Sequence, residues 1–326
     1  MPQFSRRRFI TIASVELATQ FSGLAFGSAA QPIRIVVGYP PGGMVDSFAR
    51  LLAVHGGKVL DQQIIVDNKP GAGTIIAAEN VAKSMADGRT LFLTLSGSLI
   101  NNTALYQKLP YDPNRDFTYI ALLATVPIVT TVHKSVPAAN LQELVAYSRS
   151  RKDLSFGSWA PGSAGHIVCE ALNKSYQLSL VHVPYKGEAP MIQDLVGGQI
   201  QIASGSVGSM QPHLRSGAVK AIALTGSHRS QAAPEVMTFA EQGGSSPAFA
   251  AVGWMGLVGP ANLPAETVAR WKKIVLDFLN LPDVQQRLNT YGADPKFLPA
   301  EEFYRFWQAD LPVWTKLIND TGVKLD

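Results

Sequence analysis

The chain has 326 residues, of which 46% are hydrophobic and 16% are charged. This length allows one large domain or two smaller ones, and the composition excludes a disordered tail or charged scaffold. The formal net charge is +4. It falls to +2 without residues 1–30, which hold three arginines and one glutamate, so we expect no nucleic-acid or membrane binding from charge.

Residues 1–30 resemble an export signal rather than part of the fold. Arg6-Arg7-Arg8 forms a basic segment, and Ser28-Ala29-Ala30 offers small residues for cleavage near Ala30. The basic segment resembles a twin-arginine signal, and Glu16 counts against the alternative, an ordinary Sec signal. No later apolar run reaches the roughly 20 residues that span a bilayer, so we expect a soluble periplasmic protein.

From residue 33 onward, short apolar runs alternate with helical patterns, which indicates parallel α/β layers. In the first part, strands are predicted at 33–37, 64–66, 90–94, 119–124 and 128–132, and helices at 48–59 and 75–82. In the second part, strands are predicted at 154–157, 180–183, 200–203, 221–224 and 254–258, and helices at 141–145, 167–172, 192–196 and 264–278, with further helices opening at Pro282 and Pro299. Pro127 is the expected crossing point between lobes. We expect 31–127 plus 251–326 in lobe 1, and 128–250 in lobe 2.

Small-residue turns follow several predicted strands. The first, Gly38 to Asp46, lies between an apolar strand and a helix, where backbone N–H groups can converge on an anion. A tight strand-to-helix connection explains this stretch alone equally well. Similar polar turns are predicted at 96–98, 158–166 and 204–206, at strand ends where open α/β sheets place ligands.

Catalytic motifs are lacking. The nearest approach to Gly-x-Ser-x-Gly, around Ser163, has Pro161 in place of the first glycine. The single Cys169 and six scattered histidines argue against a metal site, and we expect no cofactor. A hydrolase using Ser163 with His166 stays an alternative, with no orienting acid evident nearby. The inventory of Gly, Ser and amide groups favours binding, and we expect no enzyme.

Six motifs occur in order along the chain. They are Pro40-Pro41-Gly42-Gly43-x-x-Asp46, Asn68-Lys69-Pro70-Gly71-Ala72-Gly73, Leu105-Tyr106-x-x-Leu109-Pro110-Tyr111-Asp112, His182-Val183-Pro184-Tyr185-Lys186-Gly187-x-Ala189-Pro190, Arg229-Ser230 with Pro234-Glu235-Val236, and Trp254-x-Gly256-Leu257. With these motifs the mature chain resembles the substrate-binding receptors of tripartite tricarboxylate transporters, the Bug family of bacterial periplasmic proteins.

The resemblance implies an α/β, two-lobed type II periplasmic-binding-protein fold with a ligand cleft between the lobes. It also implies capture of a small carboxylate, a di- or tricarboxylate or an aromatic or aliphatic acid, for inner-membrane transporter subunits. A monomer is expected. A receptor that feeds a sensor system instead of a transporter is the alternative partner assignment.

Backbone amides at two helix starts, 42–44 and 162–164, are expected to hold the ligand carboxylates. Asp46 is expected to accept hydrogen bonds from its own loop. Gly205 stands where relatives often carry an acid, which argues against an amino-acid ligand. His166 has a capping or packing role as its alternative, and Trp159 either lies under the ligand or packs within its lobe. The residues expected at the ligand are Tyr39, Pro41, Gly42, Gly43, Met44, Asp46, Ser96, Ser98, Ser158, Trp159, Gly162, Ser163, His166, Tyr185, Ser204, Gly205 and Ser206.

Overall fold

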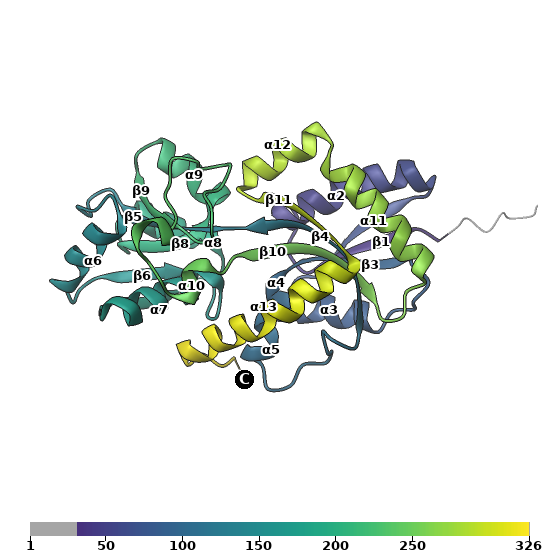
Figure 1. Cartoon of the computed structure of the whole chain (residues 1–326), viewed down its shortest axis with the longest axis horizontal. Helices are drawn as coiled ribbons and strands as arrows, with labels where there is room; N and C mark the ends of the chain where they lie inside the picture. The colour runs from purple at the N-terminus through teal and green to yellow at the C-terminus, as the bar shows by residue number, and fades with distance from the viewer. Residues whose placement is uncertain (1–30, 326) are drawn as a thin grey trace, which may run out of the picture. The chain divides into compact units, whose positions relative to one another are not determined.

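Two β-sheets organise the chain, for which the computed structural model describes residues 31–325 (Figure 1). The predicted export signal at 1–30 lies outside the described residues. We call the six-stranded sheet with the helices that cover it lobe 1, and the five-stranded sheet with its helices lobe 2.

Lobe 1 has the strand order β11-β4-β10-β3-β1-β2. Strands β2, β1 and β3 pair in parallel, whereas β10 is antiparallel to β3 and β4, and β11 is antiparallel to β4. The bounds are β1 (Ile33–Val37), β2 (Ile64–Asn68), β3 (Thr90–Leu95), β4 (Phe117–Val126), β10 (Gly253–Pro260) and β11 (Asp294–Pro299).

Lobe 2 has the strand order β7-β6-β8-β5-β9. Here β7, β6 and β8 are parallel, and β5 is antiparallel to both β8 and β9. The bounds are β5 (Ile128–His133), β6 (Ser155–Ser158), β7 (Val181–Pro184), β8 (Ile202–Ser206) and β9 (Val219–Leu224). Both sheets are therefore mixed, and the prediction of parallel layers is right only for three strands of each. Pro127 is the single residue between β4 of the six-stranded sheet and β5 of the five-stranded sheet.

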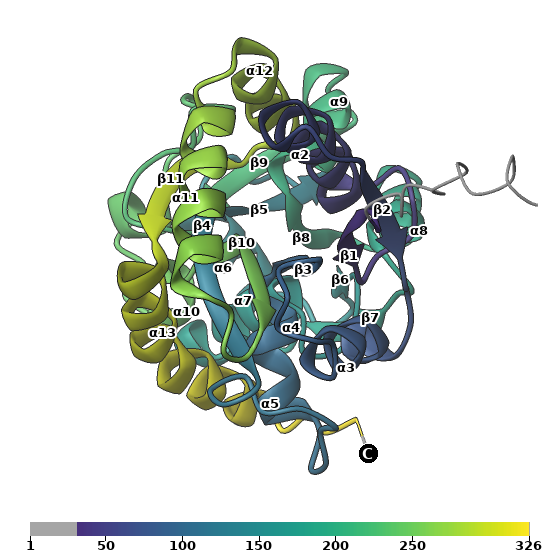
Figure 2. The same cartoon turned by 90° about the vertical axis from the view of Figure 1, so that its right-hand side faces the viewer.

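The helices cover both faces of the lobe 1 sheet. Their bounds across the chain are α2 (Met44–Leu60), α3 (Ile75–Ala82), α4 (Ser96–Leu99), α5 (Asn101–Leu105), α6 (Leu141–Arg149), α7 (Ala164–Tyr176), α8 (Glu188–Val196), α9 (Val207–Arg215), α10 (Pro247–Ala250), α11 (Ala265–Leu279), α12 (Pro282–Tyr291) and α13 (Ala300–Thr321), with 3₁₀ turns η1 (Ala72–Thr74) and η2 (Ala240–Gln242). Helices α2, α11 and α12 pack together on one face, and α3 and α13 cover the other (Figure 2).

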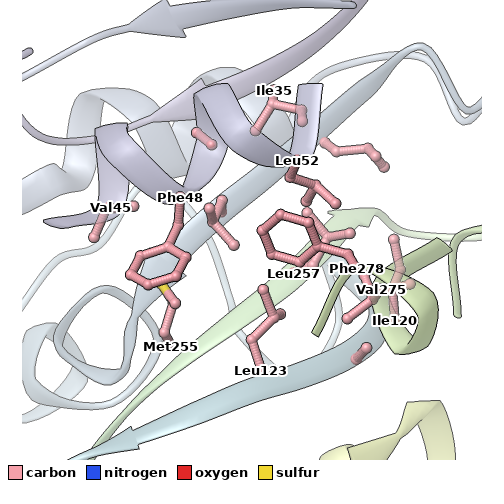
Figure 3. Packing of buried hydrophobic residues seen from close by; sticks show 14 of the residues in the cluster. Ile35, Val45, Phe48, Leu52, Ile120, Leu123, Met255, Leu257, Val275 and Phe278 are labelled. Carbon is pink, nitrogen blue, oxygen red and sulfur yellow. The ribbon is translucent and has the colours of Figure 1, made fainter. Parts of the chain in front are cut away.

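The strand period of two and the helix period of 3.6 together build this core. On β1, Ile35 belongs to the cluster under α2, while its neighbour Val36 belongs to the cluster on the opposite face. On α2, Phe48 and Leu52 lie one turn apart on the same buried side. Figure 3 shows Phe48 pointing toward Met255 of the sheet and Leu52 beside Phe278 of α11. This packing anchors the first turn of α2, the part that matters for the site.

Two local predictions are wrong, and one strand was missed. The predicted turn at 96–98 is the short helix α4, and the predicted turn at 204–206 is the end of strand β8. Strand β11 was not predicted, because Pro295 and Pro299 argue against a central strand. The structure places β11 at the sheet edge, where proline is tolerated.

Candidate functional site

The turn after β1 presents bare amides at the start of α2. Gly43 is the N-cap in an extended conformation without a side-chain cap, and Gly42 has φ +93°, a value that favours glycine. Within residues 31–325, the N–H groups of Gly43 and Met44 have no hydrogen-bond partner. Both glycines and Pro41 are exposed. An anion placed there would meet unpaired donors and the positive end of a helix.

Asp46 holds this turn from behind. It is 2% exposed, and its carboxylate accepts the Gly42 N–H at 2.9 Å. The Arg50 guanidinium contacts both carboxylate oxygens at 2.9 Å, and the Asn68 amide donates at 3.0 Å. Burial alone would raise the pKa of Asp46, but the hydrogen bonds from Arg50, Gly42 and Asn68 together lower it below its usual range. The expected loop-fixing role of Asp46 therefore agrees with its contacts.

The turn after β6 repeats this arrangement at the start of α7. Gly162 has φ +69°, and its N–H donates to Nδ1 of His166 at 3.0 Å. Ser163 is the N-cap, and its hydroxyl accepts the His166 N–H at 3.3 Å. Within the described chain, the N–H groups of Ala164 and Gly165 have no partner. Lobe 2 therefore also ends a strand with a helix start that carries unpaired donors.

The two turns share one internal hydrogen bond, which was expected for Asp46 but not for His166. In lobe 1 the Gly42 N–H donates to Asp46, and in lobe 2 the Gly162 N–H donates to His166. The acceptor lies four residues after the glycine in both cases. The amides of Gly42 and Gly162 are thus occupied, contrary to the expectation that they contact a ligand. The available donors lie one and two residues after Gly42 in lobe 1, and two and three residues after Gly162 in lobe 2.

His166 lies in a buried aromatic stack. It is 3% exposed, and its ring lies 3.9 Å from that of His182, with 12° between the ring planes. Its Nε2 lies 3.8 Å from a carboxylate oxygen of Glu170. His182 bonds Ser158 through Nε2 at 2.8 Å, and the Ser158 hydroxyl donates to the Ala160 carbonyl at 3.0 Å. Two imidazoles therefore support the lobe 2 turn.

The pKa of His182 is lowered to about 4. Burial is the largest cause, and the neighbouring His166 adds to it.

The geometry also bears on the hydrolase alternative, because the described structure has no hydrogen bond between the Ser163 hydroxyl and the His166 ring. That ring instead accepts from Gly162, so the pair lacks the geometry of a nucleophile and its base.

Several predicted serines are internal. The Ser98 hydroxyl lies 2.6 Å from that of Thr74 and 2.5 Å from that of Thr94. Ser204 is fully buried and bonds Thr130 across the sheet at 2.8 Å. Ser96 is nearly buried, at 7% exposure. These hydroxyls position strands and short helices rather than facing solvent.

Glu188 occupies the end of β8, where Ser206 caps α9. Its carboxylate accepts the Ser206 N–H at 2.7 Å and the Ser206 and Ser209 hydroxyls at 2.8 and 2.5 Å. A side chain on Gly205 would begin 3.4 Å from this carboxylate. An acid therefore does lie beside Gly205, although it comes from α8 and three donors already satisfy it. Glu188 also lines a surface groove of about 660 Å³ between α8 and α9, apart from both turns.

Three predicted aromatic residues lie close to these elements. Tyr39 is half-buried beside Ser98. Burial raises the pKa of Tyr39 to about 12, although the neighbouring Ser98 hydroxyl acts to lower it. The Trp159 ring packs against Gly165 in the first turn of α7. A Cβ added at Gly165 would lie 2.5 Å from this ring, so the packing requires glycine. Tyr185 instead bonds Asp194 of α8 at 2.7 Å.

Helices α4 and α5 connect the two turns. Ser98 of α4 lies against Tyr39, next to the lobe 1 turn. Asn101 of α5 donates to the Gly162 carbonyl at 3.1 Å, and a side chain on Gly162 would clash with Leu105. The segment 96–105 therefore contacts both turns.

Sequence reasoning missed Arg50, Asn68, Asn101, Glu188 and the supporting role of His182. Only Arg50 carried a usable signal, because it lies one helical turn after Asp46 on the same face. The others approach the site through tertiary contacts. Among residues 31–325, no three His, Cys, Asp or Glu side chains converge as a metal site, and no helix there is long and apolar enough to cross a membrane.

Residues 48–323 match the family described as TctC, tripartite tricarboxylate transporter family receptor. The chain is 30% identical to Protein BugT of Bordetella pertussis, over 97% of this chain and 96% of that protein. Among solved structures, a Rhodopseudomonas palustris protein with adipate has a TM-score of 0.80 and 30% identity, covering 90% of this chain and 98% of that one. MatC from the same organism, with bound malate, has a TM-score of 0.74 and 32% identity, covering 88% and 98%. The fold is accordingly the two-lobed α/β type II fold of periplasmic binding proteins, as the resemblance implied.

Proposed function

The chain belongs to the TctC family of tripartite tricarboxylate transporter receptors, and from this premise we propose that it captures a small dicarboxylate in the periplasm for the inner-membrane subunits of such a transporter. The ligand would lie in a cleft between the lobes, with one carboxylate at each glycine turn. We assign 31–127 plus 251–326 to lobe 1 and 128–250 to lobe 2. The expected ligand contacts are the N–H groups of Gly43 and Met44 and those of Ala164 and Gly165.

The observation that carries this proposal is the pair of helix starts with unpaired amides, one per lobe. Such a helix end stabilises an anion by up to about 2 kcal/mol in a favourable, partly buried geometry. Adipate and malate, the ligands of two structural neighbours, each carry two carboxylates. Two anionic groups on one ligand suit two donor sites on separate lobes.

The charges near the turns favour a ligand without an amino group. Arg50, the cation next to the lobe 1 turn, is committed to Asp46. Glu188 already accepts three hydrogen bonds from Ser206 and Ser209, which reduces its attraction for an ammonium group. Backbone amides, hydroxyls and bridging water would then bind the carboxylates.

The test removes single amide donors without breaking a helix. Proline is tolerated at the first helical position, where it deletes only the N–H, so Met44→Pro and Ala164→Pro should fold. Met44→Ala and Ala164→Ser keep the N–H and serve as matched controls. Calorimetry with adipate, malate, citrate, benzoate, aspartate and glutamate should show binding of a dicarboxylate that lacks an amino group. Each proline should weaken that binding about tenfold, and each control should change it little. Unchanged binding in both proline variants would refute the amide contacts. If aspartate or glutamate were the sole acids that bind, the ligand class would be refuted.

We further propose that the protein is exported with its signal cleaved near Ala30, and that it acts as a monomer. Cell fractionation should find a shortened chain in the periplasm. Light scattering after size exclusion should give the mass of one mature chain with and without dicarboxylate. Crosslinking in cells should capture membrane subunits of a tripartite transporter, whereas capture of a sensor kinase would redirect the partner assignment.

A further inference from the structure

His166 holds the same place in the lobe 2 turn that Asp46 holds in the lobe 1 turn. Each lies four residues after the first glycine of its turn and accepts that glycine's N–H, at 3.0 Å and 2.9 Å respectively. Each also faces a side chain of opposite character one helical turn later, Glu170 or Arg50. The two lobes thus use one hydrogen-bond plan with different chemistry, a carboxylate in one and an imidazole in the other.

We propose that neutral His166 positions the lobe 2 turn for the ligand, and that protonation of its imidazole releases the Gly162 amide and weakens ligand binding. The ligand part of this inference rests on the proposed function. Nδ1 accepts a hydrogen bond only while it carries no proton, so a doubly protonated ring cannot keep the Gly162 contact. A carboxylate such as Asp46 stays ionised far below the pH at which a histidine titrates.

The surroundings of His166 decide the direction of the effect. The titratable groups that face its ring are Glu170 from its own helix and His182 from β7, while Phe156 from β6 completes the stack. The neighbouring His166 ring, 3.8 Å away, is the largest cause that lowers the pKa of Glu170. Glu170 is therefore anionic and would balance the charge of an imidazolium at 166. The ligand then gains little attraction from protonation, and loss of the turn geometry dominates.

The close contact with His182 allows only one of the two imidazole rings to be positively charged at a time. The rings lie 3.9 Å apart, so charging both would place two cations in contact inside the lobe. His182 also holds the Ala160 carbonyl through Ser158. The lobe 2 turn therefore has two imidazole supports, of which His166 makes the direct contact with the turn.

The experiment compares the pH dependence of adipate and malate affinity in three proteins. In His166→Asn the side-chain oxygen replaces Nδ1 as acceptor and does not titrate, whereas His166→Phe keeps a ring and has no acceptor. From about pH 8 to about pH 5.5, wild-type affinity should fall about tenfold. His166→Asn should bind like the wild type at the upper limit and stay nearly flat. His166→Phe should bind about tenfold more weakly throughout. His133→Asn, far from the turn at the end of β5, should keep the wild-type profile.

The proposal is overturned if His166→Asn keeps the wild-type pH dependence, if a folded His166→Phe binds with full affinity, or if wild-type affinity rises toward low pH. Should neither acid bind the wild type, the proposed function fails for these probes and nitrogen NMR decides the positioning claim. It predicts an unprotonated Nδ1 at His166 at about pH 8 and a Gly162 amide signal that follows the titration of that ring. The positioning claim would be refuted by a protonated Nδ1 at about pH 8, or by a Gly162 amide signal that does not change with pH. If His166→Phe fails to fold, the Asn variant and the NMR readout carry the test.

Discussion

Asn101 of α5 donates its side-chain amide to the carbonyl of Gly162, and so joins lobe 1 to the lobe 2 turn at 3.1 Å. Its side-chain oxygen is buried and has no partner among the described residues. The packing of Gly162 against Leu105 lies beside the same contact. This hydrogen bond links α5 to the helix start where we place a ligand carboxylate.

We therefore expect Asn101→Ala to weaken dicarboxylate binding by a factor of about 5 to 10, the value of one hydrogen bond. Thermal unfolding should change little, because the contact joins two lobes that each have their own core. Calorimetry and a melting curve measure the two effects. Thr103→Ala on the same helix is the control, because its hydroxyl bonds only the local Ile100 carbonyl. An unaltered dissociation constant in Asn101→Ala would exclude a role for this contact.

Replacing Asp46 should affect both folding and binding. Asp46→Ala removes the acceptor of the Gly42 N–H, one of the two acceptors of the Asn68 amide and the carboxylate partner of Arg50. The expected loss is about 1–3 kcal/mol of unfolding free energy, with weaker dicarboxylate binding because the turn loosens. Denaturant titration and calorimetry measure these changes. Asp46→Asn, which retains one acceptor oxygen, should lose less on both counts, and equal losses in the two variants would contradict the hydrogen-bond explanation.

His182 should make the protein less stable in mild acid. Its pKa is lowered from 6.5 to about 4 by burial, so the unfolded chain takes up a proton at higher pH than the folded chain does. Its contribution to stability is full above about pH 6.5 and is lost as the pH falls toward about 4. Melting temperatures should therefore fall over this window. His182→Phe, which keeps the stacked ring, should flatten this part of the profile, and an unchanged slope would assign the effect to other groups.

Asp310 should act in the opposite direction. It accepts the Trp254 indole N–H at 3.0 Å, and burial raises its pKa from 3.8 to about 6. The folded chain therefore binds this proton more tightly than the unfolded chain, so the cost of the buried charge is relieved as the pH falls through about 6. Asp310→Asn keeps an acceptor for Trp254 and removes the charge.

We expect Asp310→Asn to melt at a higher temperature than the wild type at about pH 8. This advantage should shrink as the pH falls below about 6 and be mostly lost at about pH 4. Asp116→Asn is a suitable comparison, because its carboxylate is paired with Arg115 and has a lowered pKa. That variant should be destabilised at neutral pH. A lower melting temperature for Asp310→Asn at both pH values would show that its charge is not a cost.

The helix starts were the most predictable part of the site. Gly38 to Asp46 lies within one short stretch, so its strand, turn and helix follow from local periodicity and turn chemistry. The same holds for the turn around Gly162 and for the family motifs. That Asp46 fixes its own turn was also predictable, because an acid in the first turn of a helix meets free N–H groups nearby.

Only the tertiary structure decided how these local pieces meet. The Asn68 amide reaches Asp46 across 22 residues, the His182 ring stacks on His166 from another strand, and Glu188 comes from α8 to the end of β8. Strand direction was equally hidden, since an apolar run has the same pattern in parallel and antiparallel pairing. The side chains that occupy the Gly42 and Gly162 amides lie only four residues later, at Asp46 and His166. Long-range neighbours such as Asn68 and His182 hold those two side chains in place. For this protein the sequence alone determined where the two glycine turns lie and to which family the chain belongs. The folded chain determined which donors those turns offer and which side chains hold them in place.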